Sequence, residues 1–364
     1  MRAIGLMSGT SMDGIDIALI ETDGAEKLKR GPAGTTPYDA KFRAALAQAM
    51  AEARSLADRR ARTPHLAWIE QELTDAHAAV VADFLRAQAL RPADIAVIGF
   101  HGHTVLHRPE LRLTVQLGDG DRLAHATGID VVHDLRAADI EAGGQGAPLA
   151  PVYHRALAGG LPERPVVMVN IGGVANVTWI GRDGSLIAFD TGPGNALIDD
   201  WTRRHAGRAM DEGGALAAEG KVDEGALIAL LTHDYFCALP PKSLDRNAFR
   251  LDAVAHLSPA DGAATLTAFT AASLARAREH FPEEPRLWVI SGGGRRNKTL
   301  MAMIAGRVEG AVAPAEAAGV DGDAMEAEAW AYLAVRSLRR LPITFPGTTG
   351  VPRPMTGGAL ATKP

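Results

Sequence analysis

The sequence predicts a mixed α/β protein built from two related lobes. Apolar strands alternate along the chain with longer segments of helical periodicity, which favours this class over an all-helical or all-β fold. Two strand-turn-strand units, 3–20 and 165–180, resemble each other, and each turns at glycines. The simplest organisation puts one unit in each lobe, with a ligand between the lobes. We expect one lobe of 1–133 with 341–364 and a second lobe of 134–340.

The first unit has the composition of a phosphate-binding hairpin. Its strands, 3–7 and 15–20, flank a small polar turn. Gly9 and Gly14 let the backbone approach an anion, and the Thr10 and Ser11 hydroxyls can donate to phosphate oxygens. Asp13 or Asp16 can hold a metal ion or its waters. An ordinary hairpin turn also uses Asp-Gly, so the interpretation depends on similar glycine turns later in the chain.

The next segments alternate between helix and strand. The stretch 40–90 carries apolar residues at helical spacing and is predicted to be largely helical. Strands are predicted at 95–100, 114–118 and 129–134. The glycine-rich segment 142–148 either links the lobes or lines the ligand cleft.

Three further strands of the second lobe end in small or acidic residues. The strand 165–171 stops at Gly172-Gly173, and the strand 185–189 stops at Asp190. The strand 287–291 runs into a glycine turn, 292–294, and a helix over 298–305. The start of such a helix favours an anion or nucleotide, which supports the phosphate interpretation of the first hairpin.

The amino-acid composition indicates where in the cell the protein works and which classes of molecule are not expected to be its main partners. The chain has 364 residues, of which 47% are hydrophobic and 22% charged, enough for two domains. The single Cys237 and an N-terminus without signal-peptide order predict a cytoplasmic protein. A net charge of −5 argues against nucleic acid as the main partner. No apolar run reaches the ~18 residues of a membrane span.

Six motifs together resemble the anhydro-N-acetylmuramic acid kinases, and the resemblance runs nearly end to end. They are the segments 9–16 (GTSMDGID), 99–105 (GFHGHTV), 143–149 (GGQGAPL), 170–176 (NIGGVAN), 189–195 (FDTGPGN) and 291–294 (SGGG).

The resemblance implies the two-lobed fold of the sugar kinase, Hsp70 and actin superfamily, with ribonuclease H-like lobes that close over ATP and sugar. It also implies a reaction in which water opens the 1,6-anhydro ring while ATP phosphorylates O6. The products would be N-acetylmuramic acid 6-phosphate and ADP, in peptidoglycan recycling. A homodimer is what the family suggests.

The family assigns the catalytic base to the aspartate that matches Asp190. Ring opening needs a base that takes a proton from water as it attacks C1. A free aspartate has a pKa of ~3.9, so its carboxylate is a weak base at neutral pH. The position of the carboxylate beside the attacking water therefore matters more than its basicity. A turn-capping aspartate is the alternative interpretation.

ATP is predicted to bind with its phosphates between the first hairpin and Gly172-Gly173, with Mg²⁺ bridging phosphate oxygens and keeping most of its waters. Asp13 and Asp16 are candidates for contact with that ion, although Asp16 also fits the solvent face of a strand. The glycines 292–294 with Asn297 would receive the adenosine, unless Asn297 is a plain helix cap. The predicted nucleotide-binding set is Gly9, Thr10, Ser11, Met12, Asp13, Gly14, Ile15, Asp16, Gly172, Gly173, Asn176, Gly292, Gly293, Gly294 and Asn297.

For the sugar, the resemblance points to Arg136, Asp139, Gln145 and Glu326. The substrate carries a lactyl carboxylate, for which a cation such as Arg136 is a reasonable partner. Glu326 could hydrogen-bond sugar hydroxyls, or could simply favour the start of its helix.

No dedicated metal site is predicted. His101, His103 and His107 lack an accompanying cysteine or second carboxylate cluster, so they are interpreted as core or cleft histidines. The segment 240–247 resembles a Lys-Ser segment of the family but continues with Leu244-Asp245, where the family has Thr-Gly. This departure leaves the role of Arg246 open.

Two other function classes stay open. One is another kinase of the same superfamily, acting on an ordinary hexose or a carboxylate. The other is a non-enzymatic sensor of sugar or nucleotide. The sensor is disfavoured because Asp190 and both phosphate turns are intact.

Overall fold

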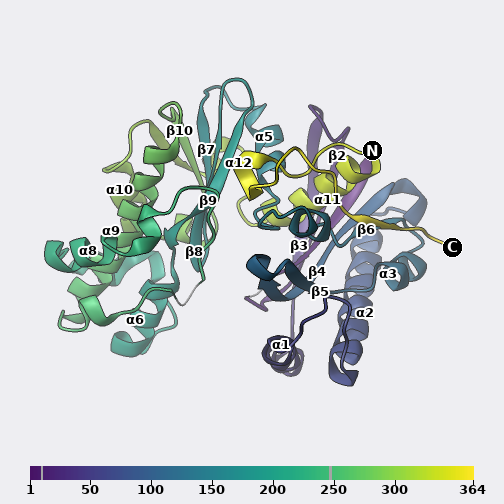
Figure 1. Cartoon of the computed structure of the whole chain (residues 1–364), viewed down its shortest axis with the longest axis horizontal. Helices are drawn as coiled ribbons and strands as arrows, with labels where there is room; N and C mark the ends of the chain where they lie inside the picture. The colour runs from purple at the N-terminus through teal and green to yellow at the C-terminus, as the bar shows by residue number, and fades with distance from the viewer. Residues whose placement is uncertain (10, 246–247) are drawn as a thin grey trace. The chain divides into compact units, whose positions relative to one another are not determined.

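The computed structural model describes residues 1–9, 11–245 and 248–364 and divides the chain into two compact units (Figure 1). Unit 1 comprises Met1–Gly159 and Ala324–Pro364, and unit 2 comprises Gly160–Asp323. These boundaries differ from the predicted ones, since 134–159 and 324–340 fall in unit 1. The segment 324–340 falls in unit 1 because the helix α11 (Met325–Leu338) packs against strands of that unit.

Unit 1 is built on a seven-stranded sheet. Its strand order is β12-β6-β4-β1-β2-β3, and β5 pairs with β4. The neighbours β1, β2 and β3 are antiparallel, whereas β4 runs parallel to β1 and to β6. The strands are β1 (Arg2–Ser8), β2 (Gly14–Thr22), β3 (Leu28–Pro37), β4 (Val97–Arg108), β5 (Leu113–Leu117), β6 (Val131–His133) and β12 (Ala359–Ala361).

The predicted helical stretch 40–90 consists of two helices. α1 (Ala40–Ala53) and α2 (Pro64–Ala87) are separated by a loop, 54–63, because Thr63 caps the second helix and Pro64 opens it. Apolar residues of both helices, such as Leu46 and Leu73, join the sheet in one hydrophobic core. The other helices of unit 1 are α3 (Gly120–Thr127), α4 (Ala137–Glu141), α5 (Pro151–Ala158), α11 and α12 (Pro346–Thr349).

Two glycines allow α11 to lie directly on the sheet. A Cβ at Gly5 of β1 would lie 1.8 Å from the Ala327 carbonyl oxygen, and one at Gly99 of β4 would lie 2.0 Å from that of Trp330. No side chain fits at either position unless the helix moves. The C-terminal segment is therefore an integral part of the first unit.

Unit 2 repeats the same arrangement with five strands, in the order β11-β10-β7-β8-β9. β7, β8 and β9 are antiparallel, and β10 is parallel to β7 and β11. The prediction of two related strand-turn-strand units is confirmed. The elements are β7 (Val166–Ile171), β8 (Val174–Ile180), β9 (Leu186–Pro193), α6 (Ala196–Ala206), α7 (Ala215–Glu219), α8 (Glu224–Leu231), α9 (Pro259–Arg276), β10 (Leu287–Ser291), α10 (Lys298–Ala305) and β11 (Ala311–Pro314).

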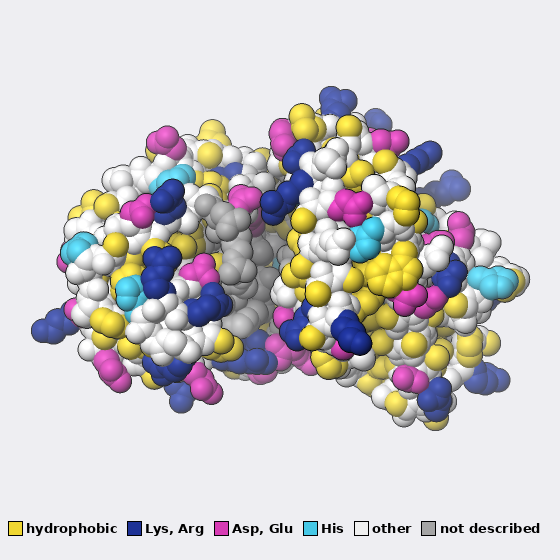
Figure 2. Space-filling model, turned by 90° about the horizontal axis from the view of Figure 1, so that it is seen from below, with side chains coloured by type: hydrophobic (Ala, Val, Ile, Leu, Met, Phe, Trp, Pro, Cys, Tyr) yellow, Lys and Arg dark blue, Asp and Glu magenta, His cyan; other side chains and the backbone are white. Residues whose placement is uncertain are grey.

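The surface carries charges of both signs. On the face drawn in Figure 2, lysine and arginine side chains are interspersed with aspartate and glutamate among the described residues. Within those residues, no helix has the length and apolar character that crossing a membrane requires.

Candidate active site

Asp190 lies in a β-bulge of unit 2. It pairs with Asn176 across the β8–β9 ladder, but the next pair is Ala175 with Gly192, so Thr191 is the extra residue. The strand was expected to end at Asp190 and instead continues to Pro193. Bulges re-aim side chains and are common next to active sites.

Two backbone bonds fix Asp190 against the segment that follows α8. Its N–H donates to the Lys242 carbonyl oxygen at 3.0 Å, and its Oδ2 accepts from the Leu244 N–H at 2.8 Å. The Tyr235 hydroxyl donates to the Asp190 carbonyl oxygen. These supporting roles have no signal in the sequence other than the Lys-Ser resemblance at 242–243. Leu244 acts through its backbone, which explains how this position tolerates a departure from the family pattern.

Burial makes the Asp190 carboxyl a weaker acid, so that its carboxylate can act as a base near neutral pH. It raises the pKa of Asp190 to about 6, although the Leu244 N–H stabilises the carboxylate and opposes the shift. The pKa is thus higher than the unperturbed value used in the sequence analysis. At neutral pH the group remains ionised and can accept a proton.

This pKa predicts the acidic limb of the pH profile. A base works only when deprotonated, so we expect kcat/KM to be constant above neutrality and to fall as the pH drops through about 6. Steady-state rates between pH 4.5 and 8.5 would measure it. A limb near pH 4 would show that the carboxyl is not desolvated in the working enzyme.

The second glycine hairpin leaves a backbone donor exposed. The carbonyl oxygens of Gly172 and Gly173 accept from the N–H groups of Asn195 and Gly194, which closes the loop against the start of α6. Among the described residues, the Gly173 N–H has no hydrogen-bond partner. A Cβ at Gly172 or Gly173 would meet no atom closer than 3.7 Å. This loop therefore has both the donor and the room that a phosphate needs.

The third glycine turn is tightly packed. Gly292 has a φ of +72°, and a Cβ there would lie 2.3 Å from Asn170 Oδ1. A Cβ at Gly294 would lie 2.4 Å from Ile171 Cγ2. Asn297 caps α10, because its Oδ1 accepts from the Leu300 N–H at 2.9 Å. The cap interpretation of Asn297 thus describes its side chain. A Cβ at Gly293 would make only an ordinary contact, 3.6 Å from Asn195 Nδ2.

The first hairpin also differs in detail from the prediction. Gly14 is required by the neighbouring strand β3, since a Cβ there would lie 2.3 Å from the Thr36 carbonyl oxygen. Ile15 belongs to the hydrophobic core, and Met12 has a left-handed φ of 58°. Asp13 is exposed, whereas Asp16 is half-buried and accepts from the Thr35 hydroxyl at 2.6 Å. Thr10 lies outside the described residues, as does Arg246.

Ser8, at the base of this hairpin, is held by two buried side chains. The Tyr38 hydroxyl donates to Ser8 Oγ at 2.8 Å, and His103 Nδ1 lies 2.9 Å from the same oxygen. Burial lowers the pKa of His103 to about 4, and likewise that of His107. Both histidines are therefore neutral at neutral pH.

The predicted sugar residues Arg136, Asp139, Gln145 and Glu326 all lie in unit 1. Arg136 donates from Nη1 to the Gly146 carbonyl oxygen at 2.8 Å. Asp139 accepts from the Gly146 N–H and from the Thr349 hydroxyl, each at 2.6 Å. Asp139 therefore positions the loop that contains Gln145.

Glu326 is exposed at the start of α11, yet its pKa is raised. The main cause is desolvation of the carboxylate by the surrounding protein. The charge of Arg136 opposes this shift, and the charge of Asp16 adds to it. Burial lowers the pKa of Arg136 to about 10, so its guanidinium is charged at neutral pH. An exposed carboxylate of this kind is suited to accept hydrogen bonds from sugar hydroxyls.

A family model described as anhydro-N-acetylmuramic acid kinase matches residues 1–363. The chain belongs to the anhydro-N-acetylmuramic acid kinase family. A member from Rhodospirillum rubrum is 56% identical over 359 residues, which cover 98% of this chain and 93% of the relative. A member from Bradyrhizobium diazoefficiens is 54% identical over 363 residues, which cover 99% of both chains.

A solved structure shows the same fold. Component A of (R)-2-hydroxyglutaryl-CoA dehydratase from Acidaminococcus fermentans matches over 93% of this chain and 99% of that chain. The TM-score is 0.50 and the sequence identity is 9%, so the likeness shows the fold alone. Together with the repeated sheet topology, it confirms for this family member the two-lobed α/β fold that the motifs implied.

Proposed function

We propose that this protein is an ATP-dependent kinase that opens the ring of 1,6-anhydro-N-acetylmuramic acid and phosphorylates O6. The products are N-acetylmuramic acid 6-phosphate and ADP, which places the enzyme in peptidoglycan recycling. The observation that carries the proposal is the clamped Asp190 carboxylate, with a pKa of about 6, in a chain that the family model matches nearly end to end.

The reaction needs one proton acceptor and one phosphoryl donor. Asp190 accepts a proton from water as the water oxygen forms a bond to C1 of the sugar. The C1–O6 bond breaks, and the released O6 electron pair attacks the γ-phosphorus of ATP. The bond between this phosphorus and the bridging oxygen then breaks, and ADP leaves. The clamp by Lys242 and Leu244 matters because it sets the direction in which the carboxylate meets the water.

ATP is assigned to the glycine turns of both units. In unit 2, the Gly173 N–H supports a phosphate contact, and a Cβ at Gly172 or Gly173 would meet no atom closer than 3.7 Å. In unit 1, the exposed Asp13 and the half-buried Asp16 supply carboxylate oxygens, which fit a Mg²⁺ ion that keeps several waters. Such an ion would neutralise phosphate charge during transfer. Among the described residues, no three His, Cys, Asp or Glu side chains form a cluster that would hold a metal without the nucleotide.

ADP release tests the proposal. The protein with ATP and Mg²⁺ is given 1,6-anhydro-N-acetylmuramic acid, N-acetylmuramic acid or N-acetylglucosamine in parallel. We expect turnover with the anhydro sugar alone. Phosphorylation of an ordinary sugar instead would assign the protein to another kinase class of the same fold, and no turnover with any sugar would favour a sensor.

The homodimer and the cytoplasmic location remain predictions. Analytical ultracentrifugation of the purified protein would determine the oligomeric state. Fractionation of the native cells would determine the location.

A further inference from the structure

A cavity of about 410 Å³ opens in unit 1, beside the loop that joins α1 to α2. This volume is within the usual range of small-molecule sites. Its lining includes Arg59, Arg60, Arg62, Glu70, His101 and Asp134. None of the arginines in this set belongs to a motif that the sequence analysis used.

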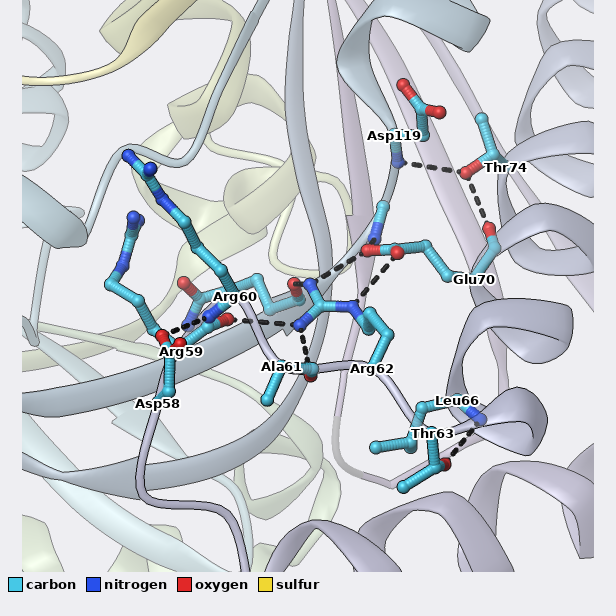
Figure 3. Close-up of polar contacts among 12 residues, drawn as sticks. Asp58, Arg59, Arg60, Ala61, Arg62, Thr63, Leu66, Glu70, Thr74 and Asp119 are labelled. Carbon is cyan, nitrogen blue, oxygen red and sulfur yellow. Dashed lines mark hydrogen bonds and ion pairs between the residues drawn. The ribbon is translucent and has the colours of Figure 1, made fainter.

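Arg62 is fully engaged by the protein. Its guanidinium donates to both carboxylate oxygens of Glu70 at 2.9 Å, and to the carbonyl oxygens of Arg59, Ala61 and Gln116 at 3.0–3.2 Å. All five of its donors are thereby used. Arg62 fixes the loop to α2 and β5, and its charge is balanced by Glu70 (Figure 3).

The other two arginines point away from this pair (Figure 3). Arg59 forms an ion pair with Asp134, which neutralises its charge. Arg60 is exposed, and its guanidinium has no hydrogen-bond or ion-pair partner in the part of the chain that the structure describes. Glu70 and Asp134 thus pair with two of the three arginines. One positive charge, on Arg60, is left for a ligand.

The cavity shares a side chain with the predicted sugar residues. His101 lines it, and His101 Nε2 lies 3.1 Å from Arg136 Nη2. The centroids of the His101 and Trp330 rings lie 4.5 Å apart, and the Arg136 guanidinium lies over the Trp330 ring. Arg136 is committed to protein groups, because it donates to Gly146 and is balanced by Glu326 and Asp139. It is therefore a weaker partner for a substrate anion than an unpaired arginine.

We propose that this cavity takes the carboxylate-bearing lactyl substituent of the sugar and that Arg60 is the partner of that carboxylate. The proposal rests on the function proposed above and replaces Arg136 with Arg60 in this role. A guanidinium suits the task because it can donate two parallel hydrogen bonds to a carboxylate. Arg60 would then distinguish muramic from glucosamine sugars.

Kinetics with two sugars test the proposal. The Arg60→Gln variant is expected to raise the KM for 1,6-anhydro-N-acetylmuramic acid about 10–100-fold, the usual effect of losing a hydrogen bond to a charged group. The kcat should change little, because Arg60 does not meet the reacting atoms. For 1,6-anhydro-N-acetylglucosamine, which lacks the lactyl group, we expect the same KM in variant and wild type. Arg60→Lys should recover part of the affinity.

Arg54→Gln serves as the matched control, because Arg54 is exposed at the end of α1 and does not line the cavity. An unchanged KM for the muramic sugar in Arg60→Gln would overturn the proposal, as would an equal rise in KM for both sugars. Calorimetric titration with N-acetylmuramic acid and N-acetylglucosamine separates this proposal from the proposed function, because it requires no turnover. A preference for the muramic sugar that is lost in Arg60→Gln supports it; an unchanged preference, or no binding of either sugar, overturns it.

Discussion

Replacing Asp190 by Asn is expected to lower kcat about 10²–10⁴-fold, the usual contribution of a general base. An amide has nearly the same shape as the carboxylate and can still accept the hydrogen bond from the Leu244 N–H. It cannot take the proton of the attacking water. The loss should therefore appear mainly in kcat, while the fold and the affinity for ATP are kept. Single-turnover measurements with saturating ATP and sugar would show it.

Asp183→Asn is the control for this variant. Asp183 is an exposed turn residue of the same unit, and its Oδ1 accepts a hydrogen bond from the Ser185 hydroxyl at 2.6 Å. We expect its kcat to match the wild type. Wild-type turnover by Asp190→Asn would show that another group takes the proton.

Replacing Gly5 by Ala is expected to destabilise unit 1 by about 3 kcal/mol, at the upper end of overpacking effects. The new Cβ would overlap the Ala327 carbonyl oxygen and lie 2.6 Å from the Ala331 N. Both are backbone atoms of α11, so the helix has to move away from the sheet. A lower midpoint of urea unfolding would report the change. Gly99→Ala should behave in the same way.

Gly34→Ala provides the comparison. Gly34 lies in β3, and a Cβ there would have no neighbour within 4 Å. Its urea midpoint is expected to remain close to that of the wild type. If Gly5→Ala had the same midpoint as Gly34→Ala, α11 would not be seated on the sheet in solution.

Much of the fold could be predicted because its signals are local. The alternation of apolar residues and the glycine turns located β1, β2, β7, β8 and β10 to within a few residues. β3 was missed, because an exposed edge strand with Gly31, Pro32 and Gly34 carries no such pattern. The boundary between the two compact units differs from the predicted one because the contact of α11 with Gly5 and Gly99 joins residues more than 200 positions apart.

The residues of the candidate site could be predicted where a sequence motif contains them. Properties that depend on residues packed around them in space could not. The Asp190 motif could be recognised from its sequence, but its raised pKa comes from burial, against the opposing hydrogen bond from the Leu244 N–H. Asn297 has the residue type of either a ligand contact or a helix cap, and only the position of Leu300 shows that it is a cap. The cavity beside Arg60 has no sequence signal, because its lining comes from several separate segments.

The mass of the reaction product tests the proposed function most directly. The protein is incubated with ATP, Mg²⁺ and 1,6-anhydro-N-acetylmuramic acid, and the sugar product is analysed by mass spectrometry. Coupled ring opening and phosphorylation predict a product heavier than the substrate by one water and one phosphoryl group. A product heavier by a phosphoryl group alone would contradict the proposal, because the anhydro ring would then be intact and Asp190 would not be activating water.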